Sequence, residues 1–230
     1  MIPLHDDNPT ERPPVITVAF IVTCVLVFFY QVSLLGESGE VFVFQYGAIP
    51  AVVFGQAELP AAAAVIPAYA TLITSMFLHG GWMHLIGNML YLWIFGNNIE
   101  DVMGHARFIL FYVTCGIVAA LSHALISPSS TIPMVGASGA ISGVLGAYLL
   151  LFPRAHVLVF MPGLGITRVA AGFVLGVWFL MQLLSGGMSL GSQGGGVAFF
   201  AHIGGFLAGM VLLRFFADTS RHPATTHRSG

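Results

Sequence analysis

The sequence contains no lysine and is poor in charge of either sign. Only 7% of its 230 residues are charged, whereas 57% are apolar. A soluble surface needs about a quarter charged residues, so this composition excludes an ordinary soluble protein. No Asp, Glu, Lys or Arg occurs between Arg107 and Arg154, or between Arg168 and Arg214. Uncharged stretches of this length indicate a chain that crosses the membrane several times.

Proline, glycine and polar clusters divide these stretches into six expected transmembrane helices. The expected fold class is therefore all-α, a polytopic membrane protein with six helices in a compact bundle. The fourth helix is short, because a bilayer core of about 30 Å takes roughly 20 helical residues. It should start below one membrane surface. The expected spans are residues 15–35, 83–99, 108–126, 138–152, 169–184 and 197–213.

The arginines predict the orientation of the bundle. With the N-terminus in the cytoplasm, all seven arginines fall on the cytoplasmic side, and the opposite side receives Glu37, Glu40 and Glu58. This asymmetry follows the positive-inside rule and places both termini in the cytoplasm. The expected organisation is a cytoplasmic N-terminal tail, a six-span membrane domain and a cytoplasmic C-terminal tail, over residues 1–14, 15–216 and 217–230.

Two connections are unusual. Residues 36–82 are too apolar for a solvated loop, which favours short helices or a re-entrant hairpin at the membrane interface. Residues 185–196 read SGGMSLGSQGGG, which is typical of a flexible connection on the outer side.

Four polar residues inside the expected spans lie at similar depth. The helical rise of about 1.5 Å per residue places Ser138 and His84 roughly 24 Å from the nearest cytoplasmic charge. The same rise places His202 and Asn88 at roughly 18 Å, so all four fall in one layer toward the outer leaflet. Ionisable groups inside a span usually serve a function, which favours a reactive site here.

Small residues suggest that the helices carrying Ser138 and His202 approach each other. Ala201, Gly205 and Gly209 repeat every four residues on one helix, and Gly139 and Gly143 do so on the other. Such faces allow close backbone contact in membranes. The alternative is that the glycines merely pack two helices and the serine fills space.

The residue types suit acyl-transfer chemistry. Neutral histidine is the usual base that activates serine near pH 7. No Asp or Glu lies in any span after the second, which leaves a Ser-His pair rather than a triad. Backbone N–H groups at the start of the helix can stabilise an oxyanion, and His84 and Asn88 share a face that can add donors. An interhelical hydrogen bond for Asn88 and an interfacial position for His84 remain alternatives.

Metal and aspartyl chemistry are not favoured. His79 and His84 are five residues apart, on different helical faces, and no HExxH pattern occurs. An intramembrane aspartyl protease needs two buried carboxylates, and the expected spans contain no Asp. No cofactor, metal ion or nucleic acid is expected as a partner.

At these residues the chain resembles the rhomboid intramembrane serine proteases, in their basic six-span bacterial form. The resemblance extends from about Thr71 to Gly209. Its motifs, in order, are HGGWMHLIGNM at 79–89, FGNNIED at 95–101, GASGA at 136–140 and AHIGGF at 201–206.

The resemblance implies a role for each candidate residue. Ser138 would be the nucleophile and His202 the general base and acid. His84, Asn88 and the backbone N–H of Ser138 would form the oxyanion hole. It also implies a first loop partly within the membrane and a last outer loop that caps the site. Some members carry an aromatic residue one turn after the nucleophile, against the catalytic histidine, but this chain has Ser142 there.

The expected function is an intramembrane serine endopeptidase that cleaves single-pass membrane proteins near the outer face. Surrounded by lipid, it would be a multi-pass protein of a bacterial inner membrane. The alternative is a non-catalytic rhomboid-like protein that binds transmembrane helices for quality control or trafficking, which the Ser-His pair disfavours. A small-molecule transporter is disfavoured because no internal repeat is evident.

Overall fold

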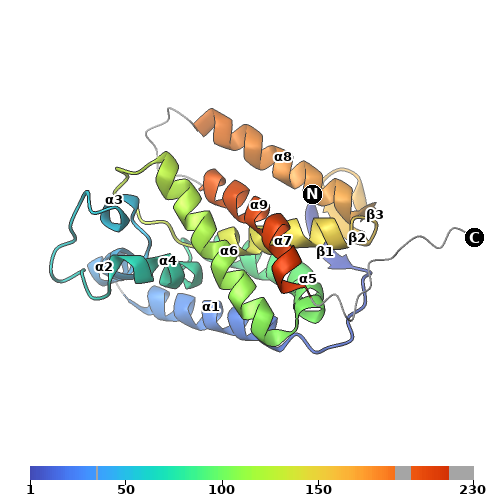
Figure 1. Cartoon of the computed structure of the whole chain (residues 1–230), viewed down its shortest axis with the longest axis horizontal. Helices are drawn as coiled ribbons and strands as arrows, with labels where there is room; N and C mark the ends of the chain where they lie inside the picture. Colours follow the sequence, from blue (N-terminus) through green and yellow to red (C-terminus); the bar gives the residue numbers. More distant parts are fainter. Residues whose placement is uncertain (35, 190–197, 218–230) are drawn as a thin grey trace, which may run out of the picture.

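The computed structural model describes residues 1–34, 36–189 and 198–217. It is mostly helical, which confirms the expected fold class, and its long helices form one compact bundle (Figure 1). In that view α1 lies along one edge of the bundle and α8 along the opposite edge. The main helices of the described residues are α1 (Val15–Ser33), α5 (Trp82–Met103), α6 (His105–Ile126), α7 (Ser138–Leu151), α8 (Ala171–Ser189) and α9 (Phe199–Phe216).

Four of these helices, α1, α6, α8 and α9, are long and apolar enough to cross a membrane. The protein is therefore a multi-pass membrane protein. The count of six spans stays a prediction, because α5 and α7 do not meet the same criteria of length and apolar composition. Helix α7 has only 14 residues, and every residue from Gly139 to Tyr148 is buried. It is thus the central helix, enclosed largely by protein.

Glycine allows α7 and α9 to pack backbone against backbone. A methyl group added at Gly205 would collide with the carbonyl oxygen of Gly139, and one at Gly209 would collide with that of Gly143. This is the close approach that the small-residue faces predicted. It fixes the relative position of the first turns of both helices, where Ser138 and His202 lie.

A three-stranded antiparallel sheet at one end of the bundle was not predicted. It consists of β1 (Ile2–Asp6), β2 (His156–Met161) and β3 (Gly165–Ala170), in that order. Strands β2 and β3 form a hairpin, and β1 pairs with β2 with Ile2 opposite Phe160. The expected fifth span was therefore placed too early, since Val169 pairs with Val157 and α8 begins only at Ala171.

Buried carboxylates tie the N-terminal segment to the end of α5. Asp101 accepts hydrogen bonds from the backbone N–H groups of Glu11 and Arg12, at 3.0 and 3.1 Å. Glu100, which is 1% exposed, accepts from the backbone of Ile16 and from the backbone and hydroxyl of Thr17, at 2.7 to 2.8 Å. Glu100 thus satisfies two of the free N–H groups in the first turn of α1, and Asp101 fixes the segment just before that helix.

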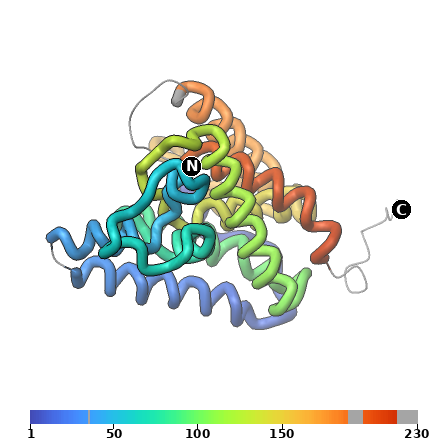
Figure 2. The backbone as a smooth tube through the Cα atoms, turned by 60° about the vertical axis from the view of Figure 1, so that its left-hand side comes forward, coloured from blue at the N-terminus to red at the C-terminus, as the bar shows by residue number. Residues whose placement is uncertain are grey.

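The connection between α1 and α5 contains short helices, as predicted. They are α2 (Glu37–Tyr46), α3 (Pro50–Val53), η1 (Ala68–Ala70), α4 (Thr71–Thr74) and η2 (Ser75–Phe77). Figure 2 shows this connection gathered on one side of the bundle, beside α1 and α6. The predicted outer connection at 185–196 begins too early, because α8 continues to Ser189. The remainder of that connection lies outside the described residues.

Candidate active site

Ser138 is the first residue of α7, and the turn before it depends on glycine. Gly136 has a φ of +125°, in the region that side-chain-bearing residues avoid. Its N–H donates to the carbonyl of Ser75 at 2.8 Å, which holds the turn against η2. Backbone N–H groups in the first turn of a helix have no intrahelical acceptor, so that of Ser138 is available to a ligand.

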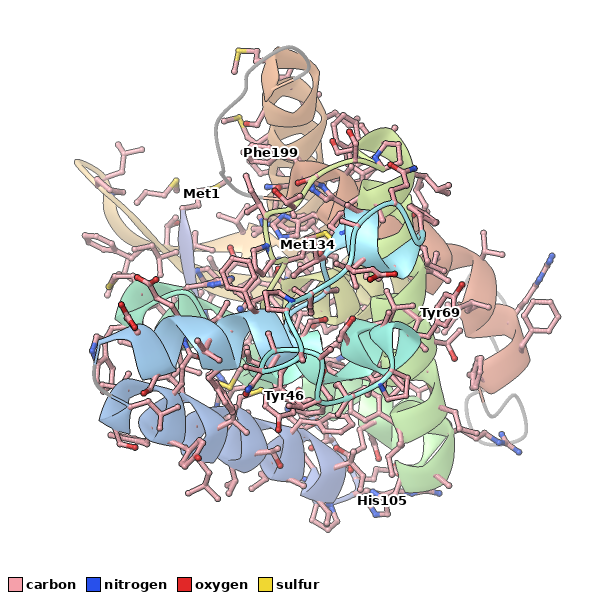
Figure 3. All side chains as sticks on the ribbon, turned by 90° about the vertical axis from the view of Figure 1, so that its left-hand side faces the viewer. Met1, Tyr46, Tyr69, His105, Met134 and Phe199 are labelled. Carbon is pink, nitrogen blue, oxygen red and sulfur yellow. The ribbon has the colours of Figure 1, made fainter. Side chains whose placement is uncertain are left out.

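Ser138 and His202 meet across the α7–α9 interface, although 64 positions separate them in the sequence. Nε2 of His202 lies 2.8 Å from Oγ of Ser138, which is hydrogen-bonding distance. In Figure 3 the chain approaches α7 past Met134 and enters α9 at Phe199, whereas His105 lies at the lower edge. The segment that leads into α7 and the start of α9 therefore lie away from the end of the bundle where α6 begins.

His84 on α5 lies directly beside the turn that precedes Ser138. A methyl group at Gly136 would lie 2.6 Å from Cε1 and 2.8 Å from Nε2 of His84. The N–H of Gly80 donates to Nδ1 of the same ring at 3.3 Å. In a neutral imidazole the other nitrogen then carries the hydrogen. Nε2–H of His84 is therefore a donor at the turn that leads to Ser138.

Asn88 lies one helical turn after His84, on the same face. Its side-chain nitrogen would be 3.6 Å from a methyl group at Gly136. The residue is 8% exposed, and this nitrogen is buried without a hydrogen-bond partner among the described residues. A buried amide donor normally has an acceptor, so an unpaired one beside a candidate nucleophile suits a ligand oxygen. The structure thus brings all four predicted residues together.

Two residues around His202 were missed by the sequence analysis. Nδ1 of His202 lies 2.7 Å from Oε1 of Gln182, and the ring of Trp178 lies 6.0 Å from the imidazole, between centroids. Both residues come from α8. Two features of the sequence could have indicated them. The two residues are four positions apart, which places them on one helical face, and Gln182 is an amide in an otherwise apolar span.

Ser142 does not contact the imidazole in the way an aromatic residue would. It is 1% exposed, and its hydroxyl donates to the carbonyl oxygen of Ser138 at 2.6 Å. Its hydrogen therefore has an acceptor within α7. The imidazole is held instead from α8, by an amide oxygen at one nitrogen and an indole ring nearby.

Comparison with known proteins gives consistent results. The family model described as a rhomboid domain matches residues 67–218. Rhomboid protein 1, mitochondrial, from Saccharomyces cerevisiae is 31% identical over 155 residues, 61% of this chain and 40% of the relative. Rhomboid protease GluP from Bacillus subtilis is 34% identical over 136 residues, 59% of this chain and 24% of the relative.

A third relative, the putative rhomboid protease YdcA of Bacillus subtilis, is 39% identical over 80 residues. That match covers 35% of this chain and 40% of the relative. The chain therefore matches less than half the length of each of these three relatives.

Proposed function

The chain belongs to the rhomboid family, and we propose that it is an intramembrane serine endopeptidase that uses Ser138 and His202 as a catalytic dyad. The observation that carries this proposal is the 2.8 Å contact between Nε2 of His202 and Oγ of Ser138, in a bundle with four helices of membrane-spanning length among the described residues. The relatives described as rhomboid proteases in Bacillus subtilis support the same activity class.

The first half of the reaction forms an acyl-enzyme. Nε2 of His202 takes the hydroxyl proton as Oγ of Ser138 bonds to the carbonyl carbon of the substrate. The peptide C–N bond then breaks, and the leaving nitrogen takes the proton from His202. The carboxyl part of the substrate remains as an ester of Ser138.

The second half releases that ester with water. His202 removes a proton from the attacking water, whose oxygen bonds to the ester carbon. The bond to Oγ breaks, and the proton returns to Ser138. A histidine that alternates as base and acid serves both halves, and the dyad ends as it began.

Three donors surround the position where negative charge develops. They are the backbone N–H of Ser138, the side-chain nitrogen of Asn88 and Nε2–H of His84. Preorganised donors of this kind are worth most where water is excluded. The side-chain nitrogen of Asn88 has no hydrogen-bond partner among the described residues, which supports this role because an oxyanion would supply an acceptor.

The proposed substrates are single-pass membrane proteins cut near the outer face, by an enzyme with both termini in the cytoplasm of a bacterium. The arginine distribution supports this orientation. Membrane-embedded proteins are also the substrates that a site within a bundle of apolar helices can reach directly.

The test is covalent labelling with a fluorophosphonate probe, together with cleavage of a transmembrane substrate in detergent. Wild type should be labelled and active, Ser138→Ala should show neither, and Ser142→Ala should keep both. His202→Ala should remain folded and lose several orders of magnitude in rate. Labelling that persists in Ser138→Ala would overturn the assignment. An unlabelled, inactive wild type that still captures transmembrane helices would indicate the non-catalytic alternative.

A further inference from the structure

The two ring nitrogens of His202 contact two different helices. Nε2 faces Ser138 on α7 at 2.8 Å, and Nδ1 faces Oε1 of Gln182 on α8 at 2.7 Å. For Nε2 to accept the serine proton, a neutral imidazole must carry its hydrogen on Nδ1. That N–H needs an acceptor, and the amide oxygen of Gln182 is at the right distance to be one.

We propose that Gln182 is a positioning residue, which fixes the tautomer and ring orientation of His202 and stabilises the imidazolium that forms during catalysis. This inference rests on the proposed function and deepens it. In serine proteases with a triad, a carboxylate serves this purpose. Here an uncharged amide on a neighbouring helix takes its place.

The packing of α8 directs Gln182 toward His202. Phe179 of α8 stacks on Phe206 of α9 with ring centroids 4.4 Å apart. A methyl group at Gly186 would lie 3.4 Å from both Phe199 and Ile203. These contacts place one face of α8 against α9. The neighbouring Leu180, Met181, Leu183 and Leu184 are exposed and point away from the bundle.

An amide is the chemically reasonable acceptor at this depth. A carboxylate within the membrane is costly unless it is paired, whereas a neutral amide can accept a hydrogen bond without bringing charge. Within the described part of the chain, the titratable groups that act electrostatically on His202 are two histidines, His84 on α5 and His123 on α6. Gln182 therefore supplies the polar contact at Nδ1 without a charge of its own.

The experiment uses the full chain in detergent and measures kcat and KM for a transmembrane substrate, the rate of fluorophosphonate labelling, and thermal unfolding. Gln182→Leu keeps similar bulk and removes the acceptor. Its kcat and labelling rate should fall roughly 10- to 1,000-fold, the range between loss of an orienting contact and loss of the correct tautomer. Its KM and unfolding temperature should stay close to wild type, because substrate binding and packing are unchanged.

Two further variants separate positioning from packing. Gln182→Glu restores an acceptor at Nδ1 and should recover at least a tenth of the wild-type labelling rate, about the level expected for a misplaced but present acceptor. Met181→Ala changes an exposed neighbour on the same helix and should behave as wild type. The acid limb of the rate profile should move to higher pH in Gln182→Glu than in Gln182→Leu, because a carboxylate stabilises the imidazolium.

The outcomes are distinct. If Gln182→Leu labels within about twofold of wild type, the positioning role is wrong while the dyad stands. The role is equally wrong if Gln182→Glu stays as slow as Gln182→Leu and their acid limbs coincide. If wild type shows no Ser138-dependent labelling, the proposed function fails, and the positioning role fails with it.

Discussion

Gly205 on α9 faces the carbonyl oxygen of Gly139 on α7 so closely that no side chain fits between the two backbones. The pair lies one residue beyond Ser138 and three residues beyond His202. The hydrogen bond between Ser138 and His202 therefore depends on a contact in which neither side chain takes part.

Gly205→Ala should separate α7 from α9, because the added methyl group meets backbone that cannot rotate away. We expect a loss of stability of about 1–3 kcal/mol or more, with much lower probe labelling because His202 moves away from Ser138. Thermal unfolding in detergent and the labelling rate measure the two effects. Gly176→Ala is the matched control, since nothing lies within 4 Å of a methyl group on that residue of α8. Equal behaviour of the two variants would contradict the packing argument.

Asn88→Ala should lower kcat by roughly 10- to 1,000-fold, the scale for one oxyanion donor. KM should change little, because the donor acts mainly in the transition state. Steady-state kinetics on a transmembrane substrate measure both constants. Met83→Ala, at an exposed position on the same helix, should leave both unchanged. A variant at Asn88 with normal kcat and raised KM would assign the residue to substrate docking instead.

Asp6, in the N-terminal strand β1, should make the stability of the fold depend on pH. Burial raises the pKa of its carboxyl above 3.8, although the hydrogen bond from the hydroxyl of Tyr148 opposes this shift. Because the pKa is higher in the folded state, protonated Asp6 contributes stability to the fold below pH 3.8. That contribution is lost as the pH rises through the pKa of Asp6 in the folded protein.

Asp6→Asn removes this dependence. The unfolding temperature of the variant should exceed that of wild type by a margin that grows as the pH is raised from about 4 to about 7. Glu11→Gln, at an exposed side chain, serves as the control and should follow wild type at each pH. A constant margin would show that folding leaves the pKa of Asp6 unchanged, and a shrinking margin would show that the folded state stabilises the carboxylate.

Substrates should be helices that unwind easily near the outer face. Ser138 must reach an extended peptide, whereas a helix in lipid keeps its carbonyls hydrogen-bonded. A poly-leucine transmembrane helix and the same helix with a Gly-Ala-Ser insertion near its outer end form the test pair. We expect the second to be cleaved faster in a gel assay, since glycine and serine weaken the helix. Equal cleavage of both would remove the requirement for unwinding.

The contact between Ser138 and His202 could be anticipated from local sequence signals. Both residues lie in uncharged helical stretches beside small residues, and depth along a helix follows from counting residues to the nearest charge. Membrane helices are constrained in length and direction, which makes such counting informative. The same reasoning grouped His84 and Asn88 with this pair, and both lie beside the turn at Gly136 that precedes Ser138.

The partner of Nδ1 could not be anticipated in this way. Gln182 and His202 meet only because α8 packs on α9 with a particular rotation, and that rotation depends on contacts such as Phe179 with Phe206. A uniformly apolar helix carries little signal for which face turns inward. The sequence therefore indicated only that Trp178 and Gln182 share a face of the helix, and not that this face contacts His202.

The sheet was missed for a different reason. The sequence from His156 to Ala170 is flanked by apolar helices, and its last residues continue the apolar run that became α8. The N-terminal residues were assigned to a tail because they are polar and few. Strand pairing between segments about 150 positions apart depends on tertiary contacts that no local pattern records.

The pairing of β1 with β2 bears on how the protein can be shortened. Removing the residues before Val15 would delete β1 and leave one edge of β2 without a partner. An unpaired strand edge is a template for association between molecules. It would also remove the backbone N–H groups of Glu11 and Arg12, which donate hydrogen bonds to the carboxylate of Asp101. A truncated version would therefore be prone to aggregate, and a purification tag belongs ahead of intact residue 1 rather than in place of the first strand.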